Sequence, residues 1–140
     1  MDRKDRDAMV ERLRAYFAAH HDHVVCAWLF GSVARNEARD DSDVDVAVLL
    51  DRPPPPSLPE SGIALAGDIE SSTGLPVDVV IMNSAPPDLV HRVLRDGIIV
   101  FERRRGERVA FEVKARNEYF DLKPYLDEYR RVAEAGRGRS

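Results

Sequence analysis

The sequence predicts an α/β fold in which a small mixed β-sheet is flanked by helices. Short apolar runs rich in β-branched residues recur along the chain and are typical of buried strands. Segments with apolar residues at steps of three and four lie between them and are typical of amphipathic helices. The 140 residues, 44% of them hydrophobic, are enough for one domain that buries its own core.

Helices and strands are expected to alternate, because turn-forming residues separate the periodic segments. The expected helices cover residues 5–19, 32–38, 59–73 and 85–96, and the expected strands cover residues 24–30, 43–50, 77–82 and 98–101. The prolines Pro53 to Pro56 break regular structure and give a stiff connector. We expect the last strand to lie at an edge of the sheet.

The C-terminal part differs in character from residues 1–106, which we expect to form the main domain. Residues 107–135 form a helical tract that we expect to be interrupted near Pro124. This extension packs either on the domain or on a partner, through its aromatic side chains Phe111, Tyr119, Phe120, Tyr125 and Tyr129. Residues 136–140 are expected to be a disordered tail.

Composition and charge exclude several classes of protein. The 21 basic and 25 acidic residues give a net charge of −4, which argues against a general nucleic-acid binder. The single Cys26 lies in an apolar run, so we expect a buried, inert thiol and no disulfide within the chain. The N-terminal segment lacks a signal-peptide core, and no apolar run reaches the length of a membrane span. We therefore expect a soluble, cytoplasmic protein without membrane contact.

The four histidines have simple structural explanations. The segment His20-His21-Asp22-His23 holds side chains that bind transition metals, but a solvated turn between a helix and a strand explains it more economically. His91 lies on the expected helix 85–96 without a partner motif, and we interpret it as a surface or structural residue.

The polar junction between the first two strands carries the candidate chemistry. Gly31 allows the backbone to turn sharply off the first strand, and Ser32 is expected to cap the short helix 32–38. The first N–H groups and positive dipole end of that helix would then form a cradle for an anion. Arg35 lies one helical turn beyond Ser32, so it could reach a bound phosphate, and Arg39 is a weaker candidate.

Three aspartates complete the predicted site. Asp43 and Asp45 alternate with valines at the start of the second strand, so both carboxylates point to the same face while the valines face the core. Asp78 is the one charge in the apolar run 77–82, and it joins the pair if its strand neighbours the second strand. Hard oxygen ligands at this spacing suit two Mg²⁺ ions about 3.5 to 4 Å apart, with Mn²⁺ as an alternative. A phosphate cradle facing such carboxylates is what nucleotidyl transfer requires.

At these residues the sequence resembles a known family. The pattern Gly-Ser, ten residues, Asp-x-Asp, with a later single Asp on a strand, resembles the DNA polymerase β-like nucleotidyltransferase superfamily. The longer string FGSVARNEARDDSDVDVAVLL is similar to the minimal nucleotidyltransferases, which are the antitoxin partners of HEPN-domain toxins. Asn36 departs from the pattern, because relatives usually carry glycine there; asparagine tolerates positive φ best among the other residues.

The resemblance implies a function and a set of roles. It implies an antitoxin that transfers AMP from ATP to a tyrosine hydroxyl of a HEPN ribonuclease toxin, with Mg²⁺ as cofactor. The implied metal ligands and catalytic residues are Asp43, Asp45 and Asp78, and the implied nucleotide-binding residues are Gly31, Ser32 and Arg35. Two alternatives remain: an antitoxin that acts by binding alone, and a nucleotidyltransferase that modifies a small molecule of the aminoglycoside type.

Overall fold

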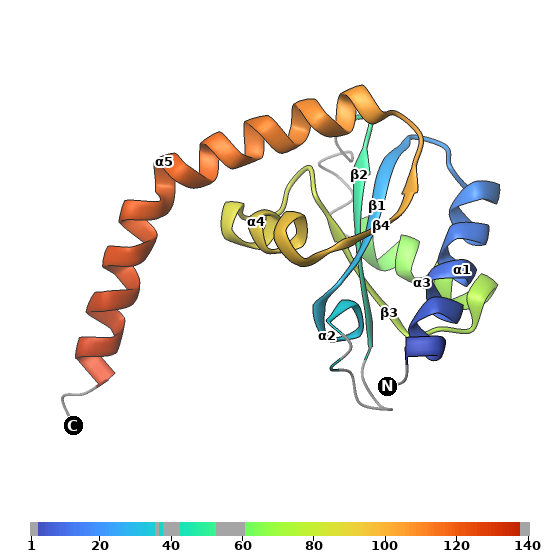
Figure 1. Cartoon of the computed structure of the whole chain (residues 1–140), viewed down its shortest axis with the longest axis horizontal. Helices are drawn as coiled ribbons and strands as arrows, with labels where there is room; N and C mark the ends of the chain where they lie inside the picture. The colour runs from blue at the N-terminus through green and yellow to red at the C-terminus, as the bar shows by residue number, and fades with distance from the viewer. Residues whose placement is uncertain (1–2, 36, 38–42, 53–60, 138–140) are drawn as a thin grey trace.

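The fold is built on four strands whose apolar side chains alternate between two faces. The computed structural model describes residues 3–35, 37, 43–52 and 61–137. Its helices are α1 (Arg3–Ala19), α2 (Gly31–Ala34), α3 (Ser61–Thr73), α4 (Pro87–Asp96) and α5 (Arg105–Arg137), and its strands are β1 (Val24–Phe30), β2 (Val44–Leu50), β3 (Val77–Ile81) and β4 (Ile98–Glu102). Figure 1 shows the sheet in the middle of the domain, with helices on both sides.

The sheet is mixed, as predicted. Its strand order is β3-β2-β1-β4. β1 pairs antiparallel with both β2 and β4, whereas β2 and β3 are parallel and are joined through the crossover helix α3. The α/β fold with a small mixed sheet is therefore confirmed, and so is the edge position of the last strand.

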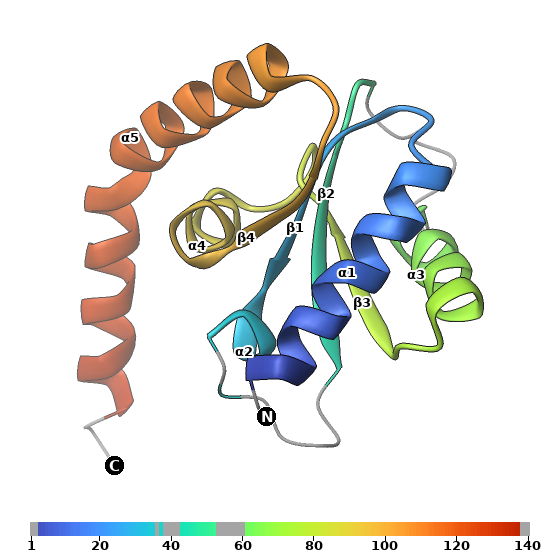
Figure 2. The same ribbon diagram turned by 45° about the vertical axis from the view of Figure 1, so that its right-hand side comes forward.

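Helices α1 and α3 cover one face of the sheet (Figure 2). Leu13 and Phe17 of α1 and Ile69 of α3 are fully buried there. They pack against alternate strand residues, namely Val44, Val46, Val48, Val77, Val79 and Ile81. The prediction that these valines face a core, away from the neighbouring aspartates, is confirmed.

Helices α4 and α5 lie on the opposite face. Trp28, Ala47 and Met82 from the strands and loop pack there against Val90 and Val93 of α4. Cys26 belongs to this cluster and is fully buried, which confirms the expectation of a buried thiol. Desolvation, followed by the charge of Glu102, raises the pKa of this thiol to about 12.

The expected interruption of the C-terminal tract is wrong. α5 runs from Arg105 to Arg137 with Pro124 inside it, and Figure 1 shows this helix bent rather than broken. A proline removes one backbone hydrogen bond but leaves the other turns in place, which is the usual cause of a bend. Gly136 and Arg137 belong to the helix instead of the expected disordered tail, and residues 138–140 lie outside the described part.

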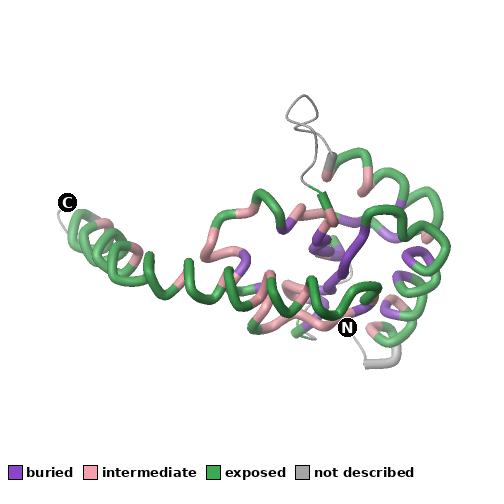
Figure 3. The backbone as a smooth tube through the Cα atoms, turned by 90° about the horizontal axis from the view of Figure 1, so that it is seen from above, coloured by how far each residue is buried: buried purple, intermediate pink, exposed green. Residues whose placement is uncertain are grey.

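The expected turn between the first helix and the first strand is confirmed. Residues 20–23 form an exposed turn, in which His23 has a φ of 65° and its Nδ1 lies 3.3 Å from Oδ1 of Asp51. The second half of α5 is mostly exposed and extends beyond the domain, as Figure 3 shows in green. None of the helices in the described ranges is both long enough and apolar enough to span a bilayer.

Candidate functional site

Two of the predicted aspartates lie side by side on the sheet. Asp45 of β2 is the register partner of Asp78 on the parallel neighbour β3. Adjacent strands lie about 4.8 Å apart, so residues paired in this way bring their side chains together on one face. The expected neighbourhood of Asp78 and the second strand is therefore confirmed, whereas the roles of both side chains stay a prediction.

Strand alternation directs these carboxylates to the face that α4 covers. Ala47 and Met82 lie on the same face of the sheet as Asp45 and Asp78, and they pack in the cluster beneath α4. Asp45 is half-buried and Asp78 is exposed, so the pair lies at the open end of this face. Asp43 comes just before β2 and is exposed to solvent.

Gly31 fits against the carboxylate of Asp45 more closely than any other residue would allow. Its φ is +75°, and a methyl group added to its α-carbon would lie 2.1 Å from Oδ2 of Asp45. Any larger side chain would displace that carboxylate and would also strain the backbone. The glycine of the motif is therefore required here by both its conformation and its neighbour.

The expected capping role of Ser32 is wrong. α2 begins at Gly31 and ends at Ala34, so Ser32 lies within the helix; Phe30 occupies the cap position without a side-chain cap. Arg6 of α1 donates from Nη1 to the carbonyl oxygen of Ala34 at 3.2 Å and anchors this short helix. Four residues give only a weak dipole, so the predicted anion cradle needs side chains as well as backbone N–H groups.

A cavity of about 360 Å³ opens beside these residues. Its lining comes from the first two strands and α2 on one side and from α4 on the other: Phe30, Gly31, Ser32, Arg35, Asp45, Leu89, Arg92, Arg95 and Asp96. Four of the six predicted site residues thus border one cavity. Asp43 and Asp78 do not line it, and Arg39 lies outside the described residues.

Negative charge predominates around Asp45. Burial, followed by the charges of Asp78 and then Asp43, raises the pKa of Asp45 above its ordinary value, and Arg35 opposes this shift. Arg35 also forms an ion pair with Glu37, with Nε 3.1 Å from Oε2. A cation between the carboxylates would relieve their repulsion, and carboxylate oxygens are the ligands that Mg²⁺ prefers.

The three aspartates are not drawn together into a finished metal centre. Within the described ranges, no three His, Cys, Asp or Glu side chains are grouped closely enough to hold a metal ion. This also leaves the segment His20 to His23 without support as a metal site. Asp45, Asp78 and Asp43 nevertheless offer the right donor type on one face, so they fit a divalent cation that would assemble with the nucleotide.

Sequence reasoning missed the contribution of α4. Arg92 and Arg95 lie three residues apart, so they are neighbours on the helix surface, and both reach the cavity. Asp96 accepts two hydrogen bonds from Arg95, at 3.0 Å from Nε and 2.8 Å from Nη2. The spacing of two arginines beside the apolar stripe of this helix was the available signal.

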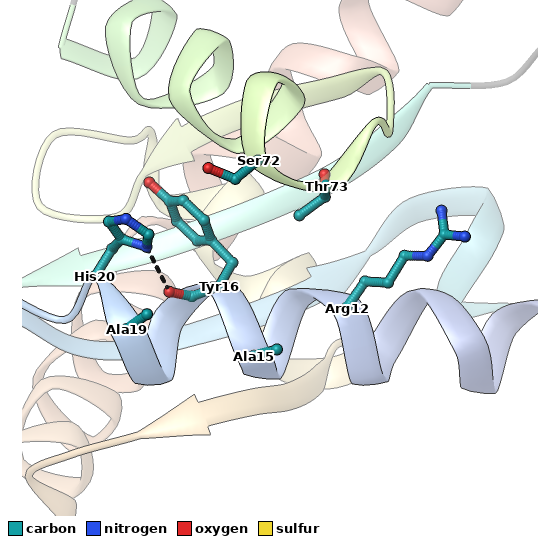
Figure 4. Close-up of a pocket in the computed structure, with 7 residues that line it drawn as sticks. All are labelled: Arg12, Ala15, Tyr16, Ala19, His20, Ser72 and Thr73. Carbon is teal, nitrogen blue, oxygen red and sulfur yellow. Dashed lines mark hydrogen bonds between the residues drawn. The ribbon is translucent and has the colours of Figure 1, made fainter.

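A second cavity, of about 370 Å³, lies between α1 and α3 on the other side of the sheet (Figure 4). In it Tyr16 stacks on His20, with ring centroids 4.6 Å apart, and its hydroxyl donates to Asp68. The ring Nδ1 of His20 lies 3.0 Å from the carbonyl oxygen of Tyr16, the contact drawn in Figure 4. These polar groups satisfy one another between two helices, so we interpret the cavity as a structural crevice.

Comparison with known proteins gives the family. The model of the polymerase beta nucleotidyltransferases matches residues 11–106. The protein adenylyltransferase MntA of Thermococcus cleftensis is 40% identical over 72 residues, which are 51% of this chain and 70% of that protein. A solved structure assigned as a minimal nucleotidyltransferase is 34% identical, with a TM-score of 0.53, over 70% of this chain and 95% of its own.

Two solved toxin–antitoxin complexes share the fold. A chain from a toxin–antitoxin crystal structure with AMP-PNP has a TM-score of 0.67 and 20% identity, over 86% of this chain and 97% of its own. A chain from a complex of the tri-AMPylated HEPN toxin of Shewanella oneidensis with its MNT antitoxin has a TM-score of 0.58 and 20% identity, over 92% and 98%. Together with the site geometry, these findings show that the chain belongs to the polymerase beta nucleotidyltransferases and is an enzyme of their minimal type.

Proposed function

We propose that this enzyme is a metal-dependent antitoxin that transfers AMP from ATP to a tyrosine hydroxyl of a HEPN ribonuclease toxin. The observation that carries the proposal is the pairing of Asp78 with Asp45, which contacts Gly31 and lines the 360 Å³ cavity. A half-buried carboxylate such as Asp45 that is repelled by a neighbouring carboxylate is costly for folding, so the presence of both on one face favours a role in binding cations.

Each site residue has a role in the proposed transfer. Gly31 and Ser32 hold the β- and γ-phosphates of ATP, and Arg35 adds a positive charge at the same end of the cavity. Asp43, Asp45 and Asp78 bind two divalent cations, Mg²⁺ or Mn²⁺, which neutralise phosphate charge and orient the attacking oxygen when bound. Asp78 is the more exposed of the paired carboxylates and faces the acceptor.

The proposed step is an in-line substitution at the α-phosphorus. The tyrosine oxygen forms a new bond to that phosphorus while the bond to the bridging oxygen of the β-phosphate breaks. Pyrophosphate leaves, and the hydroxyl proton passes to the carboxylate of Asp78. The product is the toxin tyrosine joined to AMP through a phosphodiester.

The assignment of the acceptor rests on the relatives. The relative that is 40% identical is named a protein adenylyltransferase, and the named complexes pair antitoxins of this fold with toxins, one of them AMPylated. An acceptor that is a protein also suits a catalytic face on which Asp43 and Asp78 are exposed to solvent. The cavity holds a nucleotide, and the partner supplies the remaining surface.

We further propose that residues 1–106 form the catalytic domain and that the exposed second half of the extension 107–135 contacts the toxin. Beyond Pro124 the helix exposes apolar side chains, and Tyr125 and Tyr129 are each 75% exposed. Leu122, Tyr125, Tyr129 and Val132 follow one another at steps of three, four and three, so they form one stripe on the helix. Such an exposed apolar stripe is typical of a helix that docks in a groove of another protein.

The test is an intact-mass measurement of a co-expressed partner toxin after incubation with the enzyme, ATP and Mg²⁺. We expect mass steps of one AMP with the wild type, and none with Asp45→Asn, which keeps the shape of the side chain but removes its charge. Asp7→Asn on the exposed surface of α1 is the matched control and should transfer normally. The modified tyrosine is then located by peptide mapping.

The outcomes separate the alternatives. Undiminished transfer by Asp45→Asn would reject the metal and catalytic assignment. A stable complex without any mass change would favour an antitoxin that acts by binding. Transfer of AMP to an aminoglycoside but not to the toxin would favour a small-molecule acceptor.

A further inference from the structure

The cavity beside Asp45 is lined by charged side chains from two directions, the sheet with α2 and the helix α4. Asp45 lies on the sheet side, with Asp78 and Asp43 close enough to affect its ionisation. Arg92 and Arg95 line the cavity from α4, and Arg35 lines it from the end of α2. A ligand that fills this space therefore meets the carboxylate of Asp45 and the guanidinium of Arg35 on the sheet side, and two further guanidinium groups on the side of α4.

Arg95 already holds an anion in the geometry that a phosphate would take. Its Nε and Nη2 donate to the two carboxylate oxygens of Asp96, at 3.0 and 2.8 Å, as a fork that matches phosphate oxygens equally well. Asp96 is the last residue of α4, where the helix dipole disfavours a negative charge. Helix stability therefore gives no reason for an aspartate at this position.

Arg92 differs from Arg95 because its guanidinium is not already paired with a carboxylate of the described residues. It is exposed, it lines the same cavity, and no carboxylate of the described residues lies within 4.0 Å of it. Its helix is held firmly in place by Val90 and Val93, which are buried against the sheet. A rigid helix thus presents an uncommitted cation toward the space in front of Ser32.

From this arrangement we infer that Arg92 and Arg95 form a second phosphate-binding wall and hold the β- and γ-phosphates of the nucleotide from the side opposite Ser32. The carboxylate of Asp96 pairs with the guanidinium of Arg95 until the phosphates displace this carboxylate. The inference rests on the proposed function, because it names the residues that select a nucleoside triphosphate in the same cavity. It adds two binding residues and one competing anion to the predicted set.

The experiment measures binding of three ligands by calorimetry in the presence of Mg²⁺: the β,γ-imido analogue of ATP, ADP and AMP. We compare the wild type with Arg92→Ala, Arg95→Ala, Arg92→Lys and Asp96→Asn. Arg14→Ala is the matched control, since Arg14 is an exposed arginine of α1 that pairs only with Glu11 among the described residues. Thermal unfolding of each variant tests whether the fold is kept.

We expect each arginine-to-alanine change to weaken binding of the ATP analogue roughly 10- to 100-fold, as for the loss of a charged hydrogen bond. Binding of AMP, which lacks the β- and γ-phosphates, should change little. Arg92→Lys should recover part of the loss, and Asp96→Asn should strengthen binding of the ATP analogue because the competing anion is gone.

Two results would overturn the inference while leaving the proposed function intact. One is unchanged affinity of Arg92→Ala and Arg95→Ala for the ATP analogue. The other is an equal loss for the ATP analogue and AMP, which would indicate a general disturbance of the cavity. Failure of the wild type to bind any of the three nucleotides would instead contradict the proposed function together with this inference.

Discussion

The two faces of the sheet differ although the same strands build both. On the face of α1 and α3, the valines of β2 and β3 pack against Leu13 and Phe17 in a continuous apolar core. On the face of α4 and α5, the alternate positions of those strands begin with Asp45 and Asp78 and continue into a smaller core around Trp28. One face therefore supplies stability, and this allows the other to carry charges that oppose folding.

The largest effect is expected from a substitution that creates a cavity in the core between the sheet and helices α1 and α3. Phe17→Ala removes a fully buried ring that packs against the sheet and lies 6.0 Å from the ring of Phe101. Changes of this kind cost about 3 to 5 kcal/mol of stability. Urea unfolding followed by circular dichroism should show this loss, whereas nucleotide affinity of the folded fraction should be unchanged. A loss below about 1 kcal/mol would contradict the assignment of stability to this face.

An intermediate effect is expected at Gly31, which follows β1 and lies beside Asp45. Gly31→Ala places a methyl group against Oδ2 of Asp45, so AMP transfer should fall by roughly 100-fold or more as the carboxylate is displaced. Gly74→Ala is a matched control, because Gly74 has a φ of +74° but no atom within 4 Å of the added methyl group. Both variants should lose about 1 to 2 kcal/mol of stability through backbone strain.

Single-turnover transfer rates, measured below the unfolding temperature of both glycine variants, check this prediction. Equal rates for Gly31→Ala and Gly74→Ala would show that contact with Asp45 does not matter. The comparison thus separates backbone strain, which both variants share, from displacement of the carboxylate, which only one should show.

The smallest effect is a pH dependence from the core of the second face. The folded protein holds the pKa of Cys26 at about 12, above the ordinary value of 9.0 that applies when the chain unfolds. This thiol therefore contributes its full stability below pH 9, and the contribution is lost as the pH rises from 9 toward 12 because only the unfolded state ionises. Between pH 8 and 10 the loss is about 1 kcal/mol.

The comparison of wild type with Cys26→Ala isolates the contribution of this thiol to the pH dependence of the unfolding free energy. The difference in unfolding free energy between the two proteins should shrink by that amount from pH 8 to pH 10, since alanine does not titrate. A difference that stays constant over this range would show that the thiol ionises equally in the folded and unfolded states.

The acidic half of the site could be predicted because it depends on local rules. Strand alternation fixes which face Asp43, Asp45 and Asp78 occupy, and the spacing after Gly31 fixes the turn that meets them. These rules do not say how a helix later in the chain docks on the sheet. Arg92 and Arg95 were therefore missed, because their place in the cavity follows from the packing of Val90 and Val93.

The continuity of α5 was mispredicted for a related reason. Pro124 is a strong local signal against a helix, but its effect is limited to the turn around it. Lys123 and Asp127 form an ion pair at 2.6 Å that spans this turn, and Arg131 and Glu128 form another at 2.6 Å further on. Side-chain pairs of this kind are worth only a few tenths of a kcal/mol each, yet with good helix formers on both sides they keep the helix continuous.

The bend in α5 makes Pro124 a pivot. The residues from 125 to 137 form an arm roughly 20 Å long at 1.5 Å per residue, so a small change of angle at the pivot moves the end of the arm by several ångströms. Arg130 on this arm lies 3.9 Å from Asp88 of α4, which ties its direction to the helix that also lines the cavity. The angle at Pro124 would therefore determine how a partner bound to the arm is oriented relative to the catalytic face. Replacing Pro124 would change this orientation without altering the residues of the arm that bind the partner or those of the catalytic face.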